Sequence, residues 1–306
     1  MSPFNSSSDM TAQAQIFVAI PTCNRETQLR LILQDLDQQS IRPNHIVIVD
    51  SSDTYASIRN NTSDLIVEHF HVNIKSAAQQ RNIALDYFQA ESTSNSIVFF
   101  LDDDVRIEST YIEEILKVFD LDKEVVGISG ITIEEPIRTF KRSPFTDWIG
   151  ATGEPGKITR AGINIAVRNS SQLGFVSEWL IGCSAWRLNS IGNFRFESDF
   201  KGNSIYEDVI FSYRMKQKGK LLVLPNILLH HNLSQINRAS IERTTSDWVL
   251  HRRRLLNYDI EKRLSKWRML LHDCVLLVFL LFKSSRGSSV SWSKFKGVAK
   301  GIWNLL

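Results

Sequence analysis

The sequence predicts an α/β protein in which helices flank a mainly parallel sheet, followed by a basic amphipathic helical tail. Three observations support this fold class. Apolar strand-like runs alternate with helical patterns between residues 16 and 119, which is typical of parallel sheets covered by helices. Two of these runs end on clusters of acidic residues. The C-terminal region carries an excess of positive charge.

The predicted elements alternate strictly at the start of the chain. The first strand, IFVAIPT, is a β-rich apolar run that stops at Pro21. The predicted strands cover 16–22, 45–53, 65–70 and 96–104, and the helices between them cover 25–39 and 76–89. The order is that of βαβ units, which place a ligand crevice at the carboxyl ends of the strands.

Three acidic side chains, Asp102, Asp103 and Asp104, directly follow the last of these strands. In an extended backbone Asp102 and Asp104 point to one side and Asp103 to the other. Two neighbouring carboxylates are costly unless a cation compensates them, and a divalent metal with oxygen ligands would do so. The alternative is a solvated acidic turn before the predicted helix at 109–119. The triplet alone leaves both interpretations open.

Two further polar pairs stand later in the chain. Glu207 and Asp208 precede a helical pattern, where they either carry a function or complement the helix dipole. His230 and His231 end the strand-like run LPNILLHH. Because neighbouring strand residues face opposite ways, we expect at most one of these histidines to reach a metal.

Composition and charge divide the chain into three parts. Residues 1–14 form a polar tail without the apolar segment of a secretion signal, and three cysteines without CxxC spacing favour a reducing compartment. From residue 238 onward, 14 Lys and Arg stand against five Asp and Glu, whereas the preceding residues are acidic overall. We therefore expect a cytoplasmic body at 15–237 and a basic helical region at 238–306.

Six segments, taken in order, resemble the family 2 glycosyltransferases, which are inverting enzymes with the Rossmann-like GT-A fold. A single D-x-D pattern is weak, but six segments in the family's order are a specific signal. The resemblance runs from about Ile16 to His231. The segments are VAIPTCNR, IVIVDSSD, KSAAQQRNIAL, FFLDDDV, VSEWLIGCSAWRLNSIGNF and GNSIYEDVIFSYRMKQKGKLLVLPNILLHH.

The resemblance implies a site for a nucleoside-diphosphate sugar. Asp104 would bind Mn²⁺ or Mg²⁺, with Asp102 and one histidine of His230 and His231 as further ligands, and the metal would neutralise the diphosphate. The residues implied in donor or nucleotide binding are Pro21, Asp50, Asp53, Lys75, Arg81, Asp102 and Asp103. The alternative for Arg81 is an ordinary surface position on its helix.

The same resemblance implies the chemistry of transfer. Asp208 would take the proton of the acceptor hydroxyl while Glu207 orients its surroundings, and a single base opposite the leaving group implies inversion. Gly182, Trp179 and Trp186 fall in the segment that faces the acceptor in relatives. Aromatic rings suit sugar or lipid contacts, although a buried Trp more often belongs to the core.

Two departures from the family pattern bear on the substrate. The Q-x-x-R-W sequence of processive synthases is absent, which favours transfer of a single hexose or deoxyhexose over polymerisation. The turn after the second strand reads Asp-Ser-Ser-Asp, which does not determine the identity of the nucleotide base that is bound. The glycine-containing segment 134–160 is either a mobile lid or an insertion.

The C-terminal region is expected to attach the chain peripherally to the cytosolic face of a membrane. Its apolar run at 274–282 is too short to span a bilayer. Beyond it, Trp292, Phe295 and Val298 recur at helical spacing with lysines on the other side, as in interfacial helices. The alternative is a helix packed against the catalytic domain. A glycan or lipid-linked glycan acceptor in cell-surface polysaccharide or glycolipid synthesis would suit such a tether.

Three other classes of protein fit the sequence less well. A sugar nucleotidyltransferase is expected to show an early glycine-rich loop, but residues 16–30 hold no glycine. A nucleic-acid binder could use the basic region, yet the apolar runs there suit a membrane better, so we expect no nucleic-acid partner. A non-catalytic nucleotide-sugar-binding relative is the interpretation left if Asp208 does not face the donor.

Overall fold

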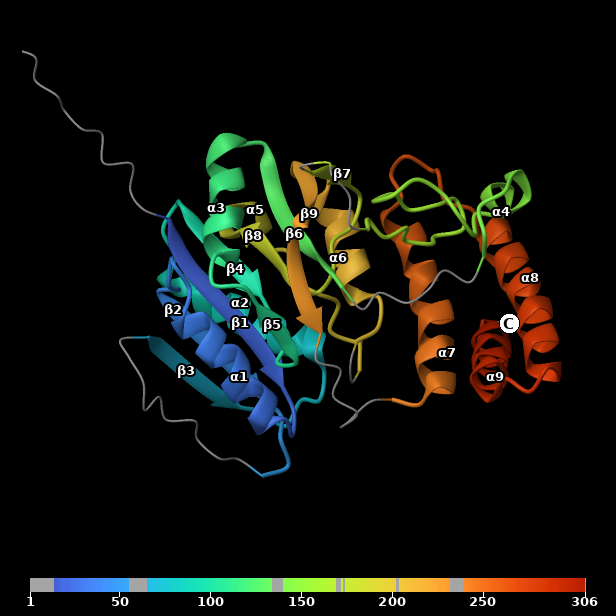
Figure 1. Ribbon diagram of the computed structural model, residues 1–306, viewed down its shortest axis with the longest axis horizontal. Coiled ribbons are helices and arrows are strands. Elements are labelled where there is room, and N and C mark those ends of the chain that lie inside the picture. The colour runs from blue at the N-terminus through green and yellow to red at the C-terminus, as the bar shows by residue number, and fades with distance from the viewer. Residues whose placement is uncertain are drawn as a thin grey trace, which may run out of the picture.

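A computed structural model shows a central sheet with helices on both faces and a group of helices beside it (Figure 1). It describes residues 14–54, 65–133, 140–168, 172, 174–201, 204–231 and 239–305. The predicted polar tail, apart from Ala14, lies outside the described residues, as does the 134–139 part of the predicted lid.

The first half of the sheet is parallel and confirms the predicted alternation of strands and helices. Its strands stand in the order β3-β2-β1-β4. The elements are β1 (Gln15–Thr22), α1 (Glu26–Asp37), β2 (His45–Asp50), β3 (Ile66–His71), α2 (Ala77–Glu91) and β4 (Ser96–Phe100). Because these strands are parallel, the polar residues that follow each of them meet at one edge.

The second half of the sheet is mixed. β8 pairs antiparallel with both β4 and β6, β6 runs parallel to β9, and β5 and β7 pair antiparallel with β9. The elements are β5 (Val105–Ile107), α3 (Tyr111–Leu121), β6 (Val125–Thr132), α4 (Pro144–Trp148), β7 (Phe175–Ser177), β8 (Ser184–Arg187), α5 (Leu188–Ile191), α6 (Glu207–Met215) and β9 (Lys220–His231).

Two apolar layers cover the two faces of this sheet. Along β1, Phe17 and Ala19 belong to one layer, whereas Ile16, Val18 and Ile20 belong to the other. The first layer is completed by α2 and α6, and the second by α1 and α3. Burial on both sides explains why the central strands are continuous apolar runs rather than alternating ones.

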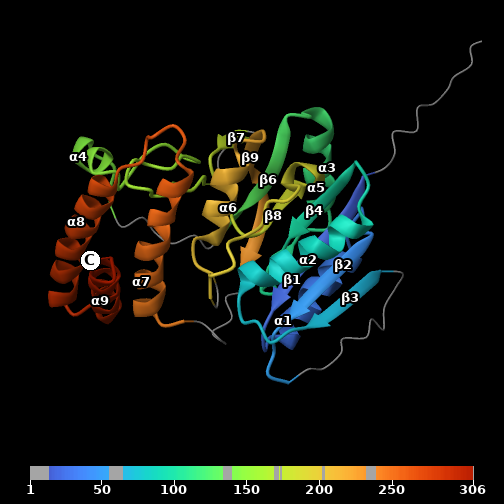
Figure 2. The same cartoon turned by 180° about the vertical axis from the view of Figure 1, so that it is seen from behind.

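A group of helices lies beside the sheet at the C-terminal end of the chain (Figures 1 and 2). It consists of α7 (Ile241–Arg252), the 3₁₀ helix η1 (Arg253–Tyr258), α8 (Lys266–Ser285) and α9 (Ser289–Trp303). Val249, Leu276, Leu280 and Val298 form its small core. Arg252 and Asp273, both fully buried, form an ion pair at 2.5 Å that ties α7 to α8. The predicted boundary at 237/238 falls on residues 232–238, outside the described ones.

Helix α9 packs closely on α7. A Cβ on Gly297 would lie 2.5 Å from the carbonyl oxygen of Glu242, and one on Gly301 would lie 2.7 Å from the Cβ of Val249. Val298, on the same side of α9, is fully buried. The apolar side that the sequence suggested for a membrane is therefore partly occupied by protein. Within the described residues, no helix is both long enough and apolar enough to cross a membrane.

Candidate active site

A cleft of about 650 Å³ opens at the carboxyl edge of the parallel strands. Its walls come from the ends of β1, β4 and β9, the start of α2, the loop before α6, and α7. The predicted site residues that line it are Pro21, Lys75, Arg81, Asp102, Asp103, Asp104, Gly182, Glu207, Asp208 and His231. The structure thus brings together residues from the first of the six segments, such as Pro21, and from the last, such as His231.

The acidic triplet forms the turn between β4 and β5. Asp103 accepts hydrogen bonds from Thr22 Oγ1 at 2.7 Å and from Arg25 Nη1 at 2.9 Å. Its burial raises the pKa of Asp103 to about 6, although Arg25 and Thr22 act in the opposite direction. Asp103 therefore fastens the turn to the end of β1, and its carboxylate is already engaged there.

Asp102, Asp104 and His231 converge on the other side of this turn. Their potential ligand atoms, one from each residue, all lie within 4.8 Å of one another. Two carboxylate oxygens and one imidazole nitrogen make a donor set that suits Mn²⁺ and is also compatible with Mg²⁺. The residues present therefore fit the divalent metal that the sequence predicted.

The pairing of β5 with β9 decides which histidine joins this cluster. Val105 stands opposite His231, and Arg106 stands opposite His230. His231 Nε2 lies 2.9 Å from Asp104 Oδ1, whereas His230 is 46% exposed and lies 3.7 Å from Glu108. His231 is therefore the candidate ligand, and the structure places His230 away from the site.

Arg81 connects the cluster of Asp102, Asp104 and His231 to the acidic start of α6. Its side chain is only 3% exposed, so the alternative of an ordinary surface position is wrong. It donates to Asp102 Oδ1 at 2.6 Å and forms a close ion pair with Glu207. A Cβ on Gly182 would approach Arg81 Nη2 to 3.2 Å, so glycine leaves room for the guanidinium. A buried planar cation with fixed donors can hold two carboxylates in place at once.

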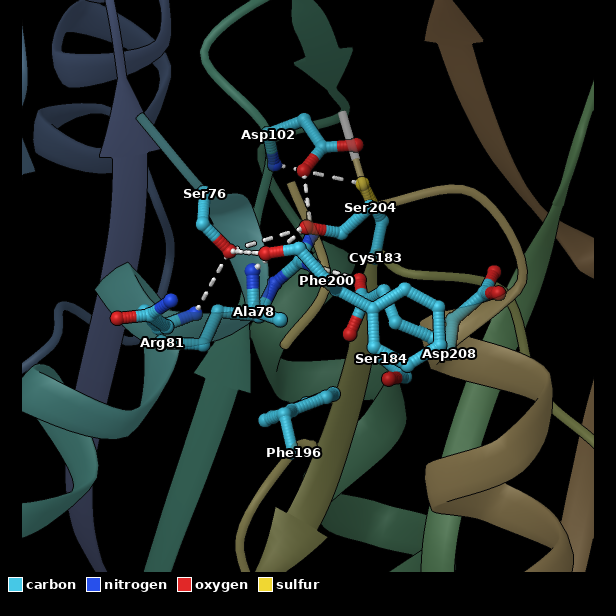
Figure 3. A network of polar contacts seen from close by, with 12 residues as sticks. Ser76, Ala78, Arg81, Asp102, Cys183, Ser184, Phe196, Phe200, Ser204 and Asp208 are labelled. Carbon is cyan, nitrogen blue, oxygen red and sulfur yellow. Dashed lines mark hydrogen bonds and ion pairs between the residues drawn. The ribbon is translucent and has the colours of Figure 1, made fainter. Parts of the chain in front are cut away.

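Hydroxyl groups hold the loop before α6 against the start of α2 (Figure 3). Ser76 Oγ donates to the carbonyl oxygen of Phe200 at 2.6 Å, and the Ala78 amide donates to Ser204 Oγ at 3.2 Å. The loop then reaches Tyr206, whose φ of 76° is left-handed. Such a conformation costs about 1 kcal/mol or more and persists only where the surroundings fix it. Here the Tyr206 hydroxyl donates to the carbonyl oxygen of Gly162.

Glu207 and Asp208 begin α6 directly after this fixed loop. Asp208 lines the cleft and accepts a hydrogen bond from the Val209 amide at 2.8 Å. Burial raises the pKa of Asp208 to about 6, which makes it a stronger base than an ordinary carboxylate. Burial also raises the pKa of Glu207, against the effect of Arg81. Within the described residues, Glu207 Oε2 is buried without a hydrogen-bond partner.

The acidic turn after β2 lies beside the cleft, with Ser51 rather than Asp50 in its lining. Burial would raise the pKa of Asp50, but hydrogen bonds from His69 at 3.2 Å and from Ser52 hold it below its ordinary value. Asp53 is exposed and pairs with Lys75 at 2.5 Å. Asp53 and Lys75 therefore form an outer rim of the cleft, and Asp50 stays ionised just behind that rim.

The structure corrects the prediction that Trp179 and Trp186 face the acceptor. Trp179 is 7% exposed and donates to the carbonyl oxygen of Ile165, and Trp186 is 1% exposed and donates to Ser184 Oγ at 2.8 Å. The Trp186 ring also fills the space over Gly127. Both rings belong to the core and neither lines the cleft, because each is enclosed on the α2 and α6 face of the sheet.

Several cleft residues were missed from the sequence. Thr22 and Arg25 both donate hydrogen bonds to Asp103. Both lie in VAIPTCNR, the first of the six segments that resemble the family, and this position could have identified them. Arg243 and Asp247 of α7 also line the cleft, one helical turn apart. Sequence reasoning assigned them to the region predicted to associate with a membrane, so their place in the same cleft as Glu207 and Asp208 was not foreseen.

Comparisons with known proteins agree with this geometry. A family model described as Glycosyl transferase family 2 matches residues 17–180, from the third residue of β1 to the segment before β8. No curated protein matches the sequence.

Several solved structures share the fold at low sequence identity. GalNAc-T7 with UDP, GalNAc and Mn²⁺ aligns with a TM-score of 0.57 and 13% identity, over 82% of this chain and 49% of that one. Residues 1–349 of TarS from S. aureus, with UDP-GlcNAc, align with a TM-score of 0.50 and 18% identity, over 87% of this chain and 71% of that one. The chain spans less than half of GalNAc-T7 and of a longer TarS structure, 43% in the second case. These likenesses show the GT-A fold.

Proposed function

This chain belongs to glycosyl transferase family 2, and from that premise we propose that it is a metal-dependent, inverting hexosyl- or deoxyhexosyltransferase. The donor is a nucleoside-diphosphate sugar, and the acceptor is a hydroxyl of a glycan or lipid-linked glycan in cell-surface polysaccharide or glycolipid synthesis. One sugar is transferred in each encounter. The observation that carries this proposal is the convergence, in one cleft, of the Asp102–Asp104–His231 cluster and the buried acids of α6.

The donor end of the cleft has the residues that a diphosphate requires. Asp102, Asp104 and His231 would hold Mn²⁺ or Mg²⁺, which would supply the positive charge that stabilises the leaving diphosphate. Arg25 lies 3.1 Å from Asp104 and adds a fixed cation beside the cluster. Ser51 and Lys75 line the side of the cleft on which the nucleoside would lie, with Asp53 paired to Lys75 at the rim and Asp50 behind it. The structures of GalNAc-T7 with UDP and Mn²⁺ and of TarS with UDP-GlcNAc support a donor of this class.

The acid–base chemistry is assigned to Asp208. With a pKa of about 6 its carboxylate is largely ionised at neutral pH, yet it binds a proton more readily than an exposed aspartate. It would accept the proton of the attacking hydroxyl as the new glycosidic bond forms and the bond to the diphosphate breaks. Attack by one activated hydroxyl, opposite the leaving group, inverts the anomeric carbon.

Glu207 and α7 form the surroundings of the acceptor. Glu207 positions Arg81, and its unpartnered Oε2 would accept a hydrogen bond from a bound hydroxyl or water. Arg243 and Asp247, whose side chains approach to 3.7 Å, extend this wall and offer one donor group and one acceptor group to a polyhydroxylated molecule. The acceptor would therefore enter between α6 and α7.

We also propose that the enzyme works peripherally on the cytosolic face of a membrane, attached through residues 238–306. The charge balance of this region and its exposed apolar residues support that location.

An Asp208→Asn variant tests the proposed base. Transfer should fall by about 10²–10⁴-fold, because amide nitrogen and oxygen cannot take the hydroxyl proton, while nucleotide binding with metal is retained. The assay is release of nucleoside diphosphate from a panel of sugar nucleotides, with detergent-extracted lipid-linked glycans as acceptors. Asp120→Asn, at an exposed pair on α3, is the matched control. Full transfer by Asp208→Asn would remove the base assignment.

A further inference from the structure

Helix α8 is apolar on two opposite faces, and only one of them is covered. On its inner face, Leu276 and Leu280 pack in the core of the helical group, and Met269 joins the apolar layer on the α2 and α6 face of the sheet. The opposite face presents a row at spacings of four, three, four and three residues. We name this row the α8 stripe: Trp267, Leu271, Cys274, Val278 and Leu281, with Phe282 beside the last.

The α8 stripe is unusually exposed for residues of its kind. Trp267 and Val278 are each 71% exposed, Phe282 is 55% exposed and Leu281 is 50% exposed. Cys274, in the middle of the stripe, is exposed as well. The stripe runs along three-quarters of a helix of 20 residues. A continuous apolar row of this length marks an interaction surface, whereas single exposed apolar residues do not.

Helix α4 extends this surface at the start of α8 (Figure 1). Phe145 and Trp148 are 56% and 54% exposed. Arg268 of α8 donates to the carbonyl oxygen of Trp148 and lies 5.5 Å from the centre of its ring, so the two helices hold each other in place. The surface therefore comes from two separate parts of the chain and is a product of the fold.

On α8 and α9 the exposed charges are of one sign, while Asp147 on α4 is paired with Arg142 at 3.0 Å. Between residues 266 and 305 the acidic residue is Asp273, and it is fully buried in its pair with Arg252. The basic residues in this range are Lys266, Arg268, Lys283, Arg286, Lys294, Lys296 and Lys300. Of these, Lys296 pairs with Glu242 at 2.9 Å. Arg286 lies 4.1 Å from the ring centre of Phe282, so cation and aromatic ring point to the same surface.

We propose that the α8 stripe and α4 form a docking surface for the headgroup region of an anionic lipid bilayer. Apolar and aromatic side chains would enter the boundary between headgroups and acyl chains, while the surrounding lysines and arginines meet lipid phosphates. The charge of the surface selects this occupant: a second copy of the chain would bring the same positive charge against it. This docking surface deepens the proposed function by naming the partner of the C-terminal region. It rests on that function in one respect, the membrane-borne acceptor.

This assignment replaces the helix that the sequence suggested. The apolar side of α9 is partly occupied by α7, as Gly297, Val298 and Gly301 show. α8 instead presents exposed apolar side chains at Trp267, Cys274, Val278, Leu281 and Phe282, with Leu271 half-buried between them. Helix α7 stands between α8 and the sheet (Figure 2), and the cleft is lined by α7 and by the sheet edge but by no residue of α8, so a docked enzyme would keep its active site open.

The proposal is tested by sedimentation of the full chain with vesicles. One preparation holds phosphatidylcholine alone and the other an equal mixture with phosphatidylglycerol. We expect the chain to bind the mixed vesicles. Trp267→Ser or Phe282→Ser should weaken this binding at least about tenfold. Lys283→Glu and Arg286→Glu should each weaken it about fivefold for the cation lost. Leu121→Ser, at an 86% exposed position on α3, is the matched control and should bind like the unchanged chain.

A second readout uses the cysteine within the stripe and needs no substitution. Peptide mass spectrometry follows the alkylation of Cys274 by a water-soluble maleimide, and mixed vesicles should slow it at least about tenfold. Binding without protection of Cys274, or binding lost equally in Leu121→Ser, would overturn the proposed surface. Protection that rises with protein concentration in the absence of lipid would mean that a second copy covers the stripe. Nucleotide titration of the same samples separates these outcomes from a failure of the proposed activity.

Discussion

Replacement of Arg81 by methionine removes the cation that joins Asp102 to Glu207. Methionine keeps most of the length and the apolar stem, so the main change is the lost charge and its donors. The Arg81 and Glu207 side chains are 3% and 5% exposed, whereas Asp102 is 35% exposed. The buried half of this pairing dominates the effect, because an exposed carboxylate can be solvated instead.

The magnitude follows from this burial. Removing one partner of a buried ion pair costs about 3–5 kcal/mol, and the partly exposed Asp102 adds at most about 1 kcal/mol. Burial raises the pKa of Glu207 to about 8, and Arg81 is the main influence that lowers it. Without Arg81 this pKa rises further. Above pH 8 the folded variant then keeps a proton on Glu207 that the folded wild type has lost. The stability of the variant relative to the wild type should therefore fall further as the pH rises. This further loss is about 1.4 kcal/mol for each pH unit in that range.

The assay is urea unfolding followed by tryptophan fluorescence at pH 6, 7, 8 and 9. We expect Arg81→Met to lower the free energy of unfolding by about 1–3 kcal/mol at pH 7, where Glu207 with its pKa of about 8 is mostly protonated, and by about 3–5 kcal/mol at pH 9, where Glu207 is ionised in the wild type. In the double variant Arg81→Met with Glu207→Gln, the growth of the deficit above pH 8 should disappear, since glutamine does not titrate. A deficit under about 1 kcal/mol, or one that is unchanged between pH 6 and pH 9, would refute the pairing as described.

Three further predictions concern the site itself. His231→Ala should weaken metal-dependent nucleotide binding at least about tenfold, whereas His230→Ala should not change it, as titration calorimetry would show; equal losses would contradict the register of β5 and β9. The value of kcat/KM should fall about tenfold per pH unit below pH 6, because protonation of Asp208 removes the base, and a flat profile between pH 5 and 7 would argue against that role. Gly182→Ala should destabilise the chain by about 1–3 kcal/mol and weaken donor binding, because its methyl group would crowd Arg81; wild-type binding would mean that the guanidinium can move.

The sequence contained enough to predict the first half of the fold and to single out Asp102 and Asp104 as candidate metal ligands. Apolar runs buried on both faces and interrupted by helical spacing predict a parallel sheet with Asp102 and Asp104 at its edge, and the family resemblance was needed to interpret these two as candidate metal ligands. The choice between His230 and His231 could not be made, because it depends on the pairing of β5 with β9. The contact of Arg25 with the acidic turn likewise depends on β1 and β4 being neighbours.

Two expectations failed or changed because periodicity does not say what covers an apolar face. Trp186 lies on β8, which the sheet encloses between β4 and β6, so its ring became part of the core. The spacing of apolar residues in α9 fits a membrane and a helical partner equally well. The glycines at 297 and 301 allow close approach to α7, so part of that apolar side of α9 meets protein, whereas the outer face of α8 carries several exposed apolar side chains.

The central claim is that the cluster of Asp102, Asp104 and His231 forms the donor site for a nucleoside-diphosphate sugar. Calorimetric titration with UDP, GDP, dTDP and CMP, each with and without Mn²⁺, tests it most directly, with Asp104→Ala as the comparison. We predict binding of one diphosphate that requires Mn²⁺ and is lost in Asp104→Ala. Failure of every nucleotide to bind the folded chain, or binding that neither Mn²⁺ nor Asp104→Ala affects, would contradict the claim.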